Sequence, residues 1–391
     1  MTLLGILPSL RTTTTSRLDP AVWPHTTRID RSGRLTIGGV ILTDIADRYG
    51  TPACVLDEAD FRRRARRYRK ELPGTNLVYA GKALLTASVA RWAAEEHLGV
   101  GVCTGDELTT ALAGGVDPAR IILHGEAMSP DDLRAAVDAG VGRIVVDSLL
   151  QVTSLARLAR RPQNVLVRVR PGDRVTSTIA AAVVEPMLRL VGLHCHIGSQ
   201  VTDARQYGEA VRRMVVAMAD VRRTHRLVLG ELNLGGGHGV PSASGDPELT
   251  LRVLSSFVDE ALDDACADER FPRPTIVVEP GRALSARAGI TLYRVDSVEP
   301  EQVNVGTEGD CGRCSATLAN RLSLSPSRPM SIGGRIADLP VDVRPGDLVA
   351  VACTGAYHPR MATEVSVRVG RISPQSAVTP GRDFSRFSAA E

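Results

Sequence analysis

One lysine stands directly after a short apolar run, and this position suggests amine chemistry. The run Leu77–Ala80 is typical of a buried strand, and Lys82 follows it just before an alanine-rich helical stretch. Burial lowers the pKa of a lysine amine and leaves its lone pair available for attack on a carbonyl carbon. On this stretch alone, a lysine that extends from the strand end to water is the simpler interpretation. Lys82 must therefore be judged by the groups that the rest of the chain places near it.

Other polar groups also follow short β-branched runs. Besides Lys82 they are His124, Asp147, Arg168, His194–Gln200, Asn233–Gly239 and Glu279–Arg282. Three consecutive glycines, Gly235, Gly236 and Gly237, expose backbone N–H groups that can bind a phosphate, although an ordinary tight turn is the alternative interpretation. The histidine-x-histidine spacing also occurs in metal sites, but no matching carboxylate or cysteine set stands out, so no metal is predicted. A lysine, a phosphate-binding turn and a carboxylate together predict pyridoxal 5'-phosphate, bound to Lys82 as a Schiff base.

The runs that carry these groups alternate with helical stretches. The eight runs are Leu77–Ala80, Gly99–Cys103, Ile121–His124, Ile144–Asp147, Val165–Val169, Leu190–His196, Leu232–Leu234 and Ile276–Glu279. Such alternation indicates a parallel sheet with helical crossovers. Eight units in a row favour an α/β fold of the closed (β/α)8, or TIM, barrel type, whose functional groups sit at the carboxyl ends of the strands.

The chain is predicted to contain more than the barrel. We expect a flexible tail over residues 1–24, strands over 25–55 that join a β domain, the barrel over 56–285, the C-terminal all-β domain over 286–373 and a flexible tail over 374–391. Gly38 and Gly39 predict a turn in the first strand region. Short strand-like runs broken by glycine and proline are the basis for the all-β domain.

The amino-acid composition argues against several classes of function. The net charge of +3, with 47 basic and 44 acidic residues, and the 3% of aromatic residues argue against a nucleic-acid surface. Seven cysteines in 391 residues are typical of a reduced, cytoplasmic protein. No apolar run reaches the length needed to span a membrane, so no membrane-spanning segment is predicted. These features favour an enzyme that acts on a small molecule.

Five motifs occur in the order found in one known family. They read Tyr-Ala-Gly-Lys-Ala, His-Cys-His-Ile-Gly-Ser-Gln, Leu-Gly-Gly-Gly, Glu-Pro-Gly-Arg and Gly-Ala-Tyr. From about Val55 to Thr363 the chain therefore resembles diaminopimelate decarboxylases and, more broadly, the ornithine/diaminopimelate decarboxylases of the alanine-racemase fold (fold type III). The resemblance implies a pyridoxal-phosphate-dependent enzyme that decarboxylates an amino acid.

The resemblance also implies roles for individual residues. Lys82 forms the Schiff base, His196 stacks on the cofactor ring and Glu279 contacts the pyridine nitrogen, and these three are the predicted catalytic residues. Ser199 and the three glycines bind the phosphate. The whole cofactor-binding set is Lys82, His196, Ser199, Gly235, Gly236, Gly237, Glu279, Gly281, Arg282 and Tyr357.

Three residues are implied to bind the amino-acid substrate. Arg282 lies near the phosphate and the substrate, and Arg313 matches the arginine that holds a substrate carboxylate. In this family, the tyrosine that corresponds to Tyr357 reaches across a dimer interface. The resemblance therefore implies a homodimer with shared active sites.

The sequence departs from the family where the substrate is recognised. The family's Cys-Glu-Ser-Gly-Asp segment supplies a cysteine from the partner subunit, and it corresponds here to Ser331–Asp338. Gly334 or its neighbour takes the place of that cysteine, and the glutamate is also absent. Asn233 stands where the family has an aspartate before the glycines.

Cofactor-holding residues thus match the family, whereas substrate-reading residues differ. We therefore predict a substrate other than standard meso-diaminopimelate. Three alternatives remain open. They are a true diaminopimelate decarboxylase that uses Cys311 or Cys314 as proton donor, an amino-acid racemase of the same fold, and a non-catalytic cofactor-binding regulator.

Overall fold

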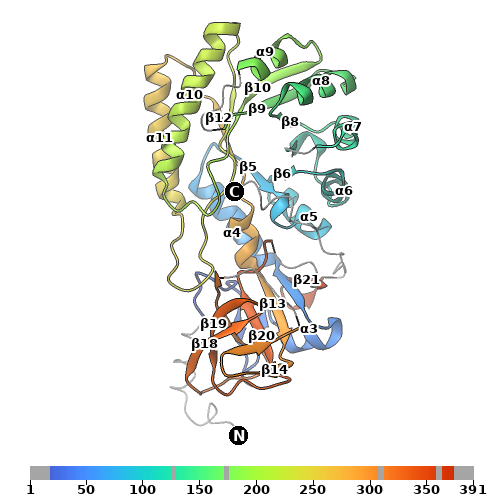
Figure 1. Cartoon of the computed structure of the whole chain (residues 1–391), viewed down its shortest axis with the longest axis vertical. Helices are drawn as coiled ribbons and strands as arrows, with labels where there is room; N and C mark the ends of the chain where they lie inside the picture. The colour runs from blue at the N-terminus through green and yellow to red at the C-terminus, as the bar shows by residue number, and fades with distance from the viewer. Residues whose placement is uncertain (1–17, 126–127, 171–175, 307–311, 358–362, 374–391) are drawn as a thin grey trace. The chain divides into compact units, whose positions relative to one another are not determined.

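The computed structural model describes residues 18–125, 128–170, 176–306, 312–357 and 363–373 (Figure 1). The chain divides into two compact units. The barrel unit comprises residues 64–240 and 248–283, and the β unit comprises residues 1–63, 241–247 and 284–391. Cys311 and the predicted tail over 374–391 lie outside the described residues.

Eight parallel strands close into a barrel in the barrel unit. They are β5 (Asn76–Ala80), β6 (Gly99–Val102), β7 (Ile121–Leu123), β8 (Arg143–Val146), β9 (Gln163–Arg168), β10 (Leu188–His194), β11 (Glu231–Asn233) and β12 (Thr275–Val278). The order around the barrel is that of the sequence, and β12 pairs with β5 to close it. Each of the eight predicted runs falls on one of these strands, so the predicted (β/α)8 barrel is confirmed.

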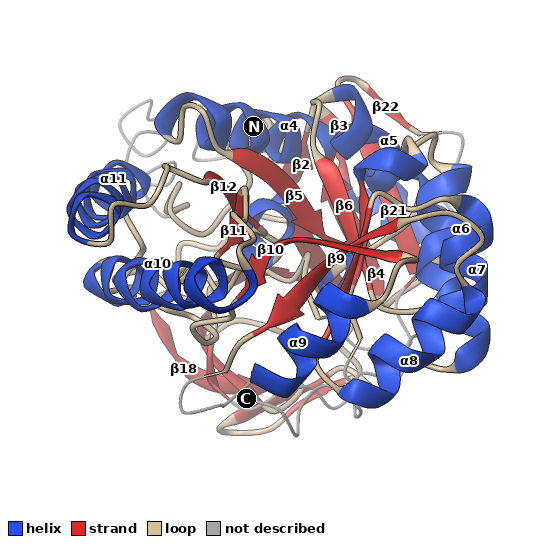
Figure 2. Ribbon diagram, turned by 90° about the horizontal axis from the view of Figure 1, so that it is seen from above, coloured by secondary structure: helices blue, strands red, loops and turns tan. Residues whose placement is uncertain are grey.

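Helices follow the strands and lie around the barrel (Figure 2). They are α5 (Ala87–Glu95), α6 (Gly105–Ala113), α7 (Pro130–Ala139), α8 (Leu149–Leu158), α9 (Thr176–Val184), α10 (Arg205–His225) and α11 (Leu251–Asp268), and α4 (Glu58–Glu71) precedes the first strand. Four of these helices begin at a hydroxyl side chain that accepts a hydrogen bond from the third residue of the helix, which satisfies a backbone donor at the helix start. The capping residues are Thr86, Thr104, Ser129 and Ser148.

A small apolar cluster lies among the barrel strands. It contains Val78, Ile122, Val145, Leu166 and Val277, one residue from each of five strands. Branched side chains suit this position because they pack well on a pleated sheet and have few rotamers to lose. These apolar side chains occupy the space among the strands, and in such barrels the functional polar groups lie at the strand ends.

The β unit contains three sheets. Strands β1 (Arg28–Ile29), β2 (Leu35–Ile37) and β3 (Val40–Ile41) form a sheet of their own. A six-stranded sheet has the order β17 (Ala316–Leu318), β20 (Leu348–Ala352), β13 (Gly289–Arg294), β4 (Ala53–Asp57), β21 (Thr363–Arg368) and β22 (Arg371–Ile372). A five-stranded sheet has the order β14 (Ser297–Val298), β15 (Gln302–Asn304), β18 (Ser327–Ile332), β19 (Arg335–Pro340) and β16 (Gly312–Arg313). These sheets confirm that the C-terminal region is a β domain.

The region predicted as strands over 25–55 differs from the structure in one element. Helix α3 (Leu42–Tyr49) lies within it, and its buried residues are Leu42, Ile45 and Ala46. These positions have the spacing of one helical face, which outweighs the β-branched residues just before it. The turn predicted at Gly38 and Gly39 joins β2 to β3, with φ angles of 57° and 82° that favour glycine.

Two residues of the segment 1–24, which was predicted to be a flexible tail, are packed in the structure. Val22 and Trp23 are buried in the apolar core of the β unit, because their large side chains pack with the residues of β2 and α3. Residues 1–17 lie outside the described part. Among the described residues, no helix combines the length and the apolar character that crossing a membrane requires.

Candidate active site

Lys82 lies in a short 3-10 turn, Gly81–Ala83, at the carboxyl end of β5. The hydroxyl of the buried Tyr79 donates a hydrogen bond to the carbonyl of Leu84 at 2.5 Å, which fixes the chain on either side of the lysine. A Cβ atom on Gly81 would lie 2.8 Å from the carbonyl oxygen of Gly101 on the next strand. The turn therefore needs glycine before Lys82 in order to fit against β6.

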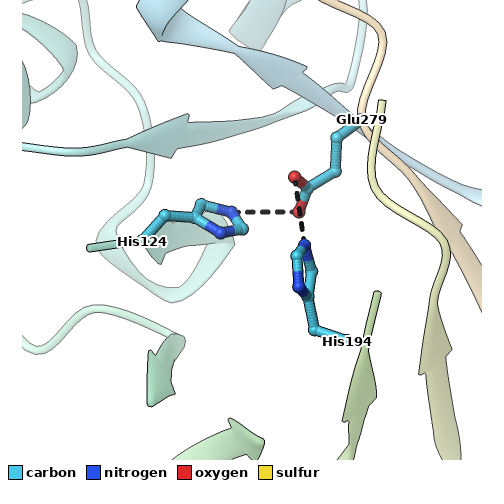
Figure 3. A group of neighbouring side chains, drawn as sticks. All are labelled: His124, His194 and Glu279. Carbon is cyan, nitrogen blue, oxygen red and sulfur yellow. Dashed lines mark ion pairs between the residues drawn. The ribbon is translucent and has the colours of Figure 1, made fainter. Parts of the chain in front are cut away.

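Glu279 directly follows β12, the strand beside β5, and is 6% exposed. Two histidine rings from other strand ends point at its carboxylate (Figure 3). His124 Nε2 lies 3.0 Å from Oε1, and His194 Nε2 lies 3.9 Å from Oε2. The Asn233 side-chain amide donates a hydrogen bond to Oε1 at 2.7 Å. Four strand ends therefore meet at one buried carboxylate.

This environment keeps Glu279 charged. Burial by itself raises the pKa of the carboxyl group, but His124, His194 and the Asn233 amide together outweigh burial and hold the pKa well below its usual range. Oε2 makes no hydrogen bond within the described part of the chain and meets only His194, at the longer distance. The site therefore offers an ionised oxygen that can accept a hydrogen bond from a ligand.

His196 lies two residues beyond β10 and is neutral near pH 7. Burial lowers its pKa to about 4, and the positive charges of Lys82 and Arg168 act in the same direction. A Cβ atom on Gly235 would lie 3.2 Å from His196 Nδ1, so the ring packs against the glycine turn. Lys82, His196 and the glycine turn are thus brought together, as the sequence predicts.

The three glycines after β11 allow backbones to approach closely. Gly235 and Gly237 have φ angles of 67° and 87°, and a Cβ on Gly236 would lie 2.3 Å from the carbonyl oxygen of Glu279. A Cβ on Gly237 would collide with the carbonyl of Gly198 in the loop that carries Ser199. The N–H groups of Gly236 and Gly237 make no hydrogen bond to any described residue. They are therefore available to an anion, and the exposed Ser199 lies in the adjoining loop.

The remaining predicted site residues fall into two groups. Gly281 belongs to the barrel unit, and a Cβ there would lie 3.0 Å from Ala83 Cβ, so it packs on the turn of Lys82. Arg282 is the first residue of α12 (Arg282–Ser285) and is partly buried. Arg313 and Tyr357 belong to the β unit, and their predicted roles remain predictions.

His124, His194 and Asn233 were expected at strand ends from the sequence, but no role in the site was predicted for them. All three follow or end barrel strands, and this position was the signal that could have identified them. Among the described residues, His124, His194 and Glu279 also form a group with metal-ligand spacing, with ligand atoms within 4.8 Å of one another. Their carboxylate was not matched to the histidines because it lies on a strand far along the chain.

Comparison with known proteins identifies the family of the chain. Residues 58–180 and 174–286 match the family described as "Pyridoxal-dependent decarboxylase, pyridoxal binding domain". The chain belongs to this family. The decarboxylase is 40% identical to a diaminopimelate decarboxylase of Actinosynnema pretiosum subsp. auranticum, over 95% of this chain and 94% of that protein. It is 36% identical to a diaminopimelate decarboxylase of Mycobacterium tuberculosis, over 90% of this chain and 92% of that protein.

Solved structures confirm the fold of this decarboxylase. Diaminopimelate decarboxylase from M. jannaschi superposes with a TM-score of 0.80 at 21% identity, covering 94% of this chain and 98% of that chain. A lysine/ornithine decarboxylase from Vibrio vulnificus, solved with putrescine, superposes with a TM-score of 0.72 at 22% identity, covering 84% of this chain and 97% of that chain. The protein is therefore a fold type III amino-acid decarboxylase whose cofactor is pyridoxal 5'-phosphate.

The residues of the decarboxylase fit this cofactor. An amine, an ionised carboxylate with one oxygen free of hydrogen bonds, and two available glycine N–H groups lie at neighbouring strand ends. These groups match, in order, the aldehyde, the ring nitrogen and the phosphate of pyridoxal phosphate. The described site supplies a complementary group for each of these parts of the cofactor.

Proposed function

We propose that this decarboxylase removes the α-carboxylate of an amino acid other than standard meso-diaminopimelate. The reacting group of the protein is the Lys82 amine. The observation that carries the proposed role of Lys82 is the ionised Glu279, held by His124 and Asn233 at the strand end beside Lys82. A carboxylate whose charge is fixed in this way can hold a proton on a pyridine nitrogen.

Each described residue then has a defined task. Bound pyridoxal phosphate supplies an electron sink for the electron pair left when a carboxylate departs as carbon dioxide. Lys82 would hold the cofactor through its amine, the group that attacks a carbonyl carbon. Glu279 would hold a proton on the ring nitrogen through Oε2, the oxygen that makes no hydrogen bond to the described residues. His196 presents a neutral ring beside the glycine turn, which suits stacking because it brings no charge.

The phosphate is assigned to the glycine turn. The N–H groups of Gly236 and Gly237 and the hydroxyl of Ser199 would donate to it. Gly281 allows the turn of Lys82 to approach β12. Arg282 adds a positive charge after β12. Fixing the phosphate orients the reactive part of the cofactor toward Lys82, and this is the contribution of binding to catalysis.

The substrate proposal depends on the hairpin formed by β18 and β19. Ile332 pairs with Arg335, and Gly333 and Gly334 form the turn between them with φ angles of 53° and 83°. This segment corresponds to the family's Cys-Glu-Ser-Gly-Asp, yet the turn carries neither a thiol nor a carboxylate. Loss of a group that binds one end of a substrate changes which substrate is preferred.

Cys314 is poorly suited to replace the missing proton donor. It is 8% exposed within an apolar cluster of the β unit, and burial raises the pKa of its thiol to about 11. A thiol in such a core is usually inert because it reaches neither solvent nor ligand. This observation disfavours a true diaminopimelate decarboxylase that uses Cys314.

The assembly and compartment are part of the same proposal. We propose a cytoplasmic homodimer in which Tyr357 of the partner subunit completes each site together with Arg313. The support is the resemblance of Gly-Ala-Tyr to the family motif and the match of a diaminopimelate decarboxylase to 95% of this chain.

A substrate panel tests the proposal. The holoenzyme is mixed with meso-diaminopimelate, lysine, ornithine, arginine and other amino acids in both configurations, and carbon dioxide release is measured. We expect one of the others to exceed meso-diaminopimelate in kcat/KM by about 100-fold or more. A preference for meso-diaminopimelate would overturn the substrate proposal. It would not contradict the conclusion that the protein is a decarboxylase.

Solvent exchange separates the remaining outcomes. Incorporation of deuterium at Cα from heavy water without carbon dioxide release would indicate a racemase. Cofactor binding with neither exchange nor carbon dioxide release would indicate a non-catalytic homologue. Either result would contradict the proposed reaction.

A further inference from the structure

Asn233 links two parts of the site through both atoms of its side-chain amide. It is the last residue of β11 and is fully buried. Its Nδ2 donates to Glu279 Oε1 at 2.7 Å, and its Oδ1 accepts from the N–H of Gly235 at 2.8 Å. The N–H of Glu279 in turn donates to the carbonyl of Gly235 at 2.8 Å. These three hydrogen bonds form a closed link between the carboxylate and the glycine turn.

The orientation of the amide follows from its partners. The N–H of Gly235 can only donate, so the amide oxygen must face it. An ionised Glu279 can only accept, so the NH2 group must face the carboxylate. An aspartate would still accept from Gly235, but it could donate to Glu279 only if it carried a proton. The position therefore distinguishes asparagine from aspartate through a single hydrogen bond.

We propose that Asn233 is a positioning residue that fixes both the place and the charge of Glu279 relative to the phosphate-binding glycine turn. The inference rests on the proposed function, in which Glu279 Oε2 faces the ring nitrogen of the cofactor. Because Asn233 occupies Oε1, Oε2 is left for the ligand. Because an amide is neutral, the ring nitrogen meets one full negative charge that does not depend on a shared proton.

Other charged groups surround the same carboxylate. The titratable and charged side chains that interact with Glu279 or with its neighbours are His124, His194, His196, Cys103, Cys195, Lys82 and Arg168. In the Asn233→Asp variant, a second carboxylate would lie about as close to Glu279 as the amide does now. Two carboxylates at that distance share one proton, which raises the pKa of the pair.

The Asn233→Asp variant tests the inference because it keeps the bond to Gly235 and removes only the bond to Glu279. At low pH the shared proton restores the hydrogen bond, and at high pH the bond is lost. We expect kcat to fall roughly tenfold to hundredfold between about pH 6 and pH 9, the value of one charge-assisted hydrogen bond. The absorption spectrum of bound cofactor should change over the same pH range, and wild type should show neither change.

Asn76→Asp is the matched control. Asn76 is the exposed first residue of β5, so this variant adds the same charge to the same barrel at the opposite ends of its strands. We expect its kcat and its spectrum to follow wild type. An Asn233→Asp enzyme with the kcat profile and spectrum of wild type would overturn the inference. A wild-type protein that binds no cofactor would instead overturn the proposed function.

An exchange variant covers the case in which Asn233→Asp does not fold. Asn233→Asp combined with Glu279→Gln swaps the amide and the carboxylate, so the hydrogen bond is restored with reversed direction. We expect the double variant to melt close to wild type and well above Asn233→Asp, and to remain inactive because the carboxylate has moved. If the double variant melts no higher than the single one, the link does not hold the site together and the inference fails.

Discussion

At the scale of single residues, Lys82 is unusual because lysine is rare in this chain. The sequence contains 47 basic residues, and only two of them, Lys70 and Lys82, are lysines. Lys70 is exposed near the end of α4, whereas Lys82 lies at a barrel strand end among the groups of the site. A chain that uses arginine almost everywhere else retains an amine where carbonyl chemistry requires one, because arginine stays protonated.

This composition makes the Schiff-base assignment testable with two variants. Lys82→Ala should lose the absorbance of covalently bound cofactor and reduce carbon dioxide release at least about 1,000-fold, because the reactive amine is gone. Lys70→Ala should behave like wild type. After borohydride reduction, mass spectrometry of the wild type should find the label on the peptide of Lys82. Label on the peptide of Lys70 would refute the assignment.

His238, directly after the glycine turn, carries a stability effect that depends on pH. Its ring stacks on Tyr68, with Nδ1 2.8 Å from the tyrosine hydroxyl, and its Nε2 has no hydrogen-bond partner among the described residues. Burial lowers its pKa from 6.5 to about 4. Between these values the unfolded chain binds a proton that the folded chain does not. Stability is therefore present above pH 6.5 and is lost as the pH falls toward 4.

Urea unfolding of the apoprotein at several pH values checks this effect. His238 alone should remove roughly 3 kcal/mol of unfolding free energy on acidification from neutral pH to about pH 4. In His238→Leu that loss should shrink, although the variant forfeits the hydrogen bond to Tyr68. His97→Asn alters an exposed histidine and should keep the full acid slope. An unchanged slope in His238→Leu would contradict the assigned pKa.

At the scale of elements, the Asp132 side chain in the first turn of α7 joins the start of α7 to the start of α6. Asp132 accepts hydrogen bonds from the backbone and hydroxyl of Ser129, which caps α7, and its other oxygen accepts from the N–H of Gly105 at 2.6 Å, where α6 begins. Its neighbour Asp131 is 89% exposed and pairs only with Arg134 among the described residues. The two aspartates share a helix turn but differ in their tasks.

The difference predicts unequal costs for the same substitution. Asp132→Ala should lower the free energy of unfolding by about 1–2 kcal/mol, because Ser129 at the start of α7 and the N–H of Gly105 both lose the carboxylate that accepts their hydrogen bonds. Asp131→Ala should change it by no more than about 0.5 kcal/mol, as expected for an exposed ion pair. Chemical denaturation of both variants at neutral pH measures this. Equal effects would show that the contact with Gly105 contributes nothing.

The elements themselves were largely predictable from the sequence. Each barrel strand lies in a short apolar run, and each following helix shows a helical pattern, so the sequence around each element is enough to predict it. Helix α3 was missed because β-branched residues precede it and it is short. The bond between Asn233 and Glu279 was not predictable, because it depends on the register of β11 with β12, which pairs Asn233 with Val277.

At the scale of the whole molecule, shared sites make a quantitative prediction. If Lys82 of one subunit works with Tyr357 of the partner subunit, Lys82→Ala and Tyr357→Ala are each inactive as homodimers. Mixed under conditions that exchange subunits, they should regain about a quarter of wild-type activity, since half of the dimers then carry one intact site. A mixture that stays inactive, although native mass spectrometry shows mixed dimers, would refute the sharing of sites.

The contacts of His124 and His194 with Glu279 could not be predicted from the sequence. Motifs led to the residues that are predicted to touch the cofactor, one strand at a time. The contacts of His124 and His194 with Glu279 join three strands whose neighbours are fixed only when the whole barrel closes. Local patterns cannot show such contacts, because none of the three residues is near another in the chain.

The pairing of β12 with β5 also bears on how the protein is made. Lys82 follows the first barrel strand and Glu279 the last, so a ribosome has released almost the entire barrel before the two can meet. A nascent chain that ends before β12 has no complete place for the coenzyme. Binding of the coloured coenzyme during synthesis would therefore show that β12 has paired with β5. A chain terminated before β12 would remain colourless.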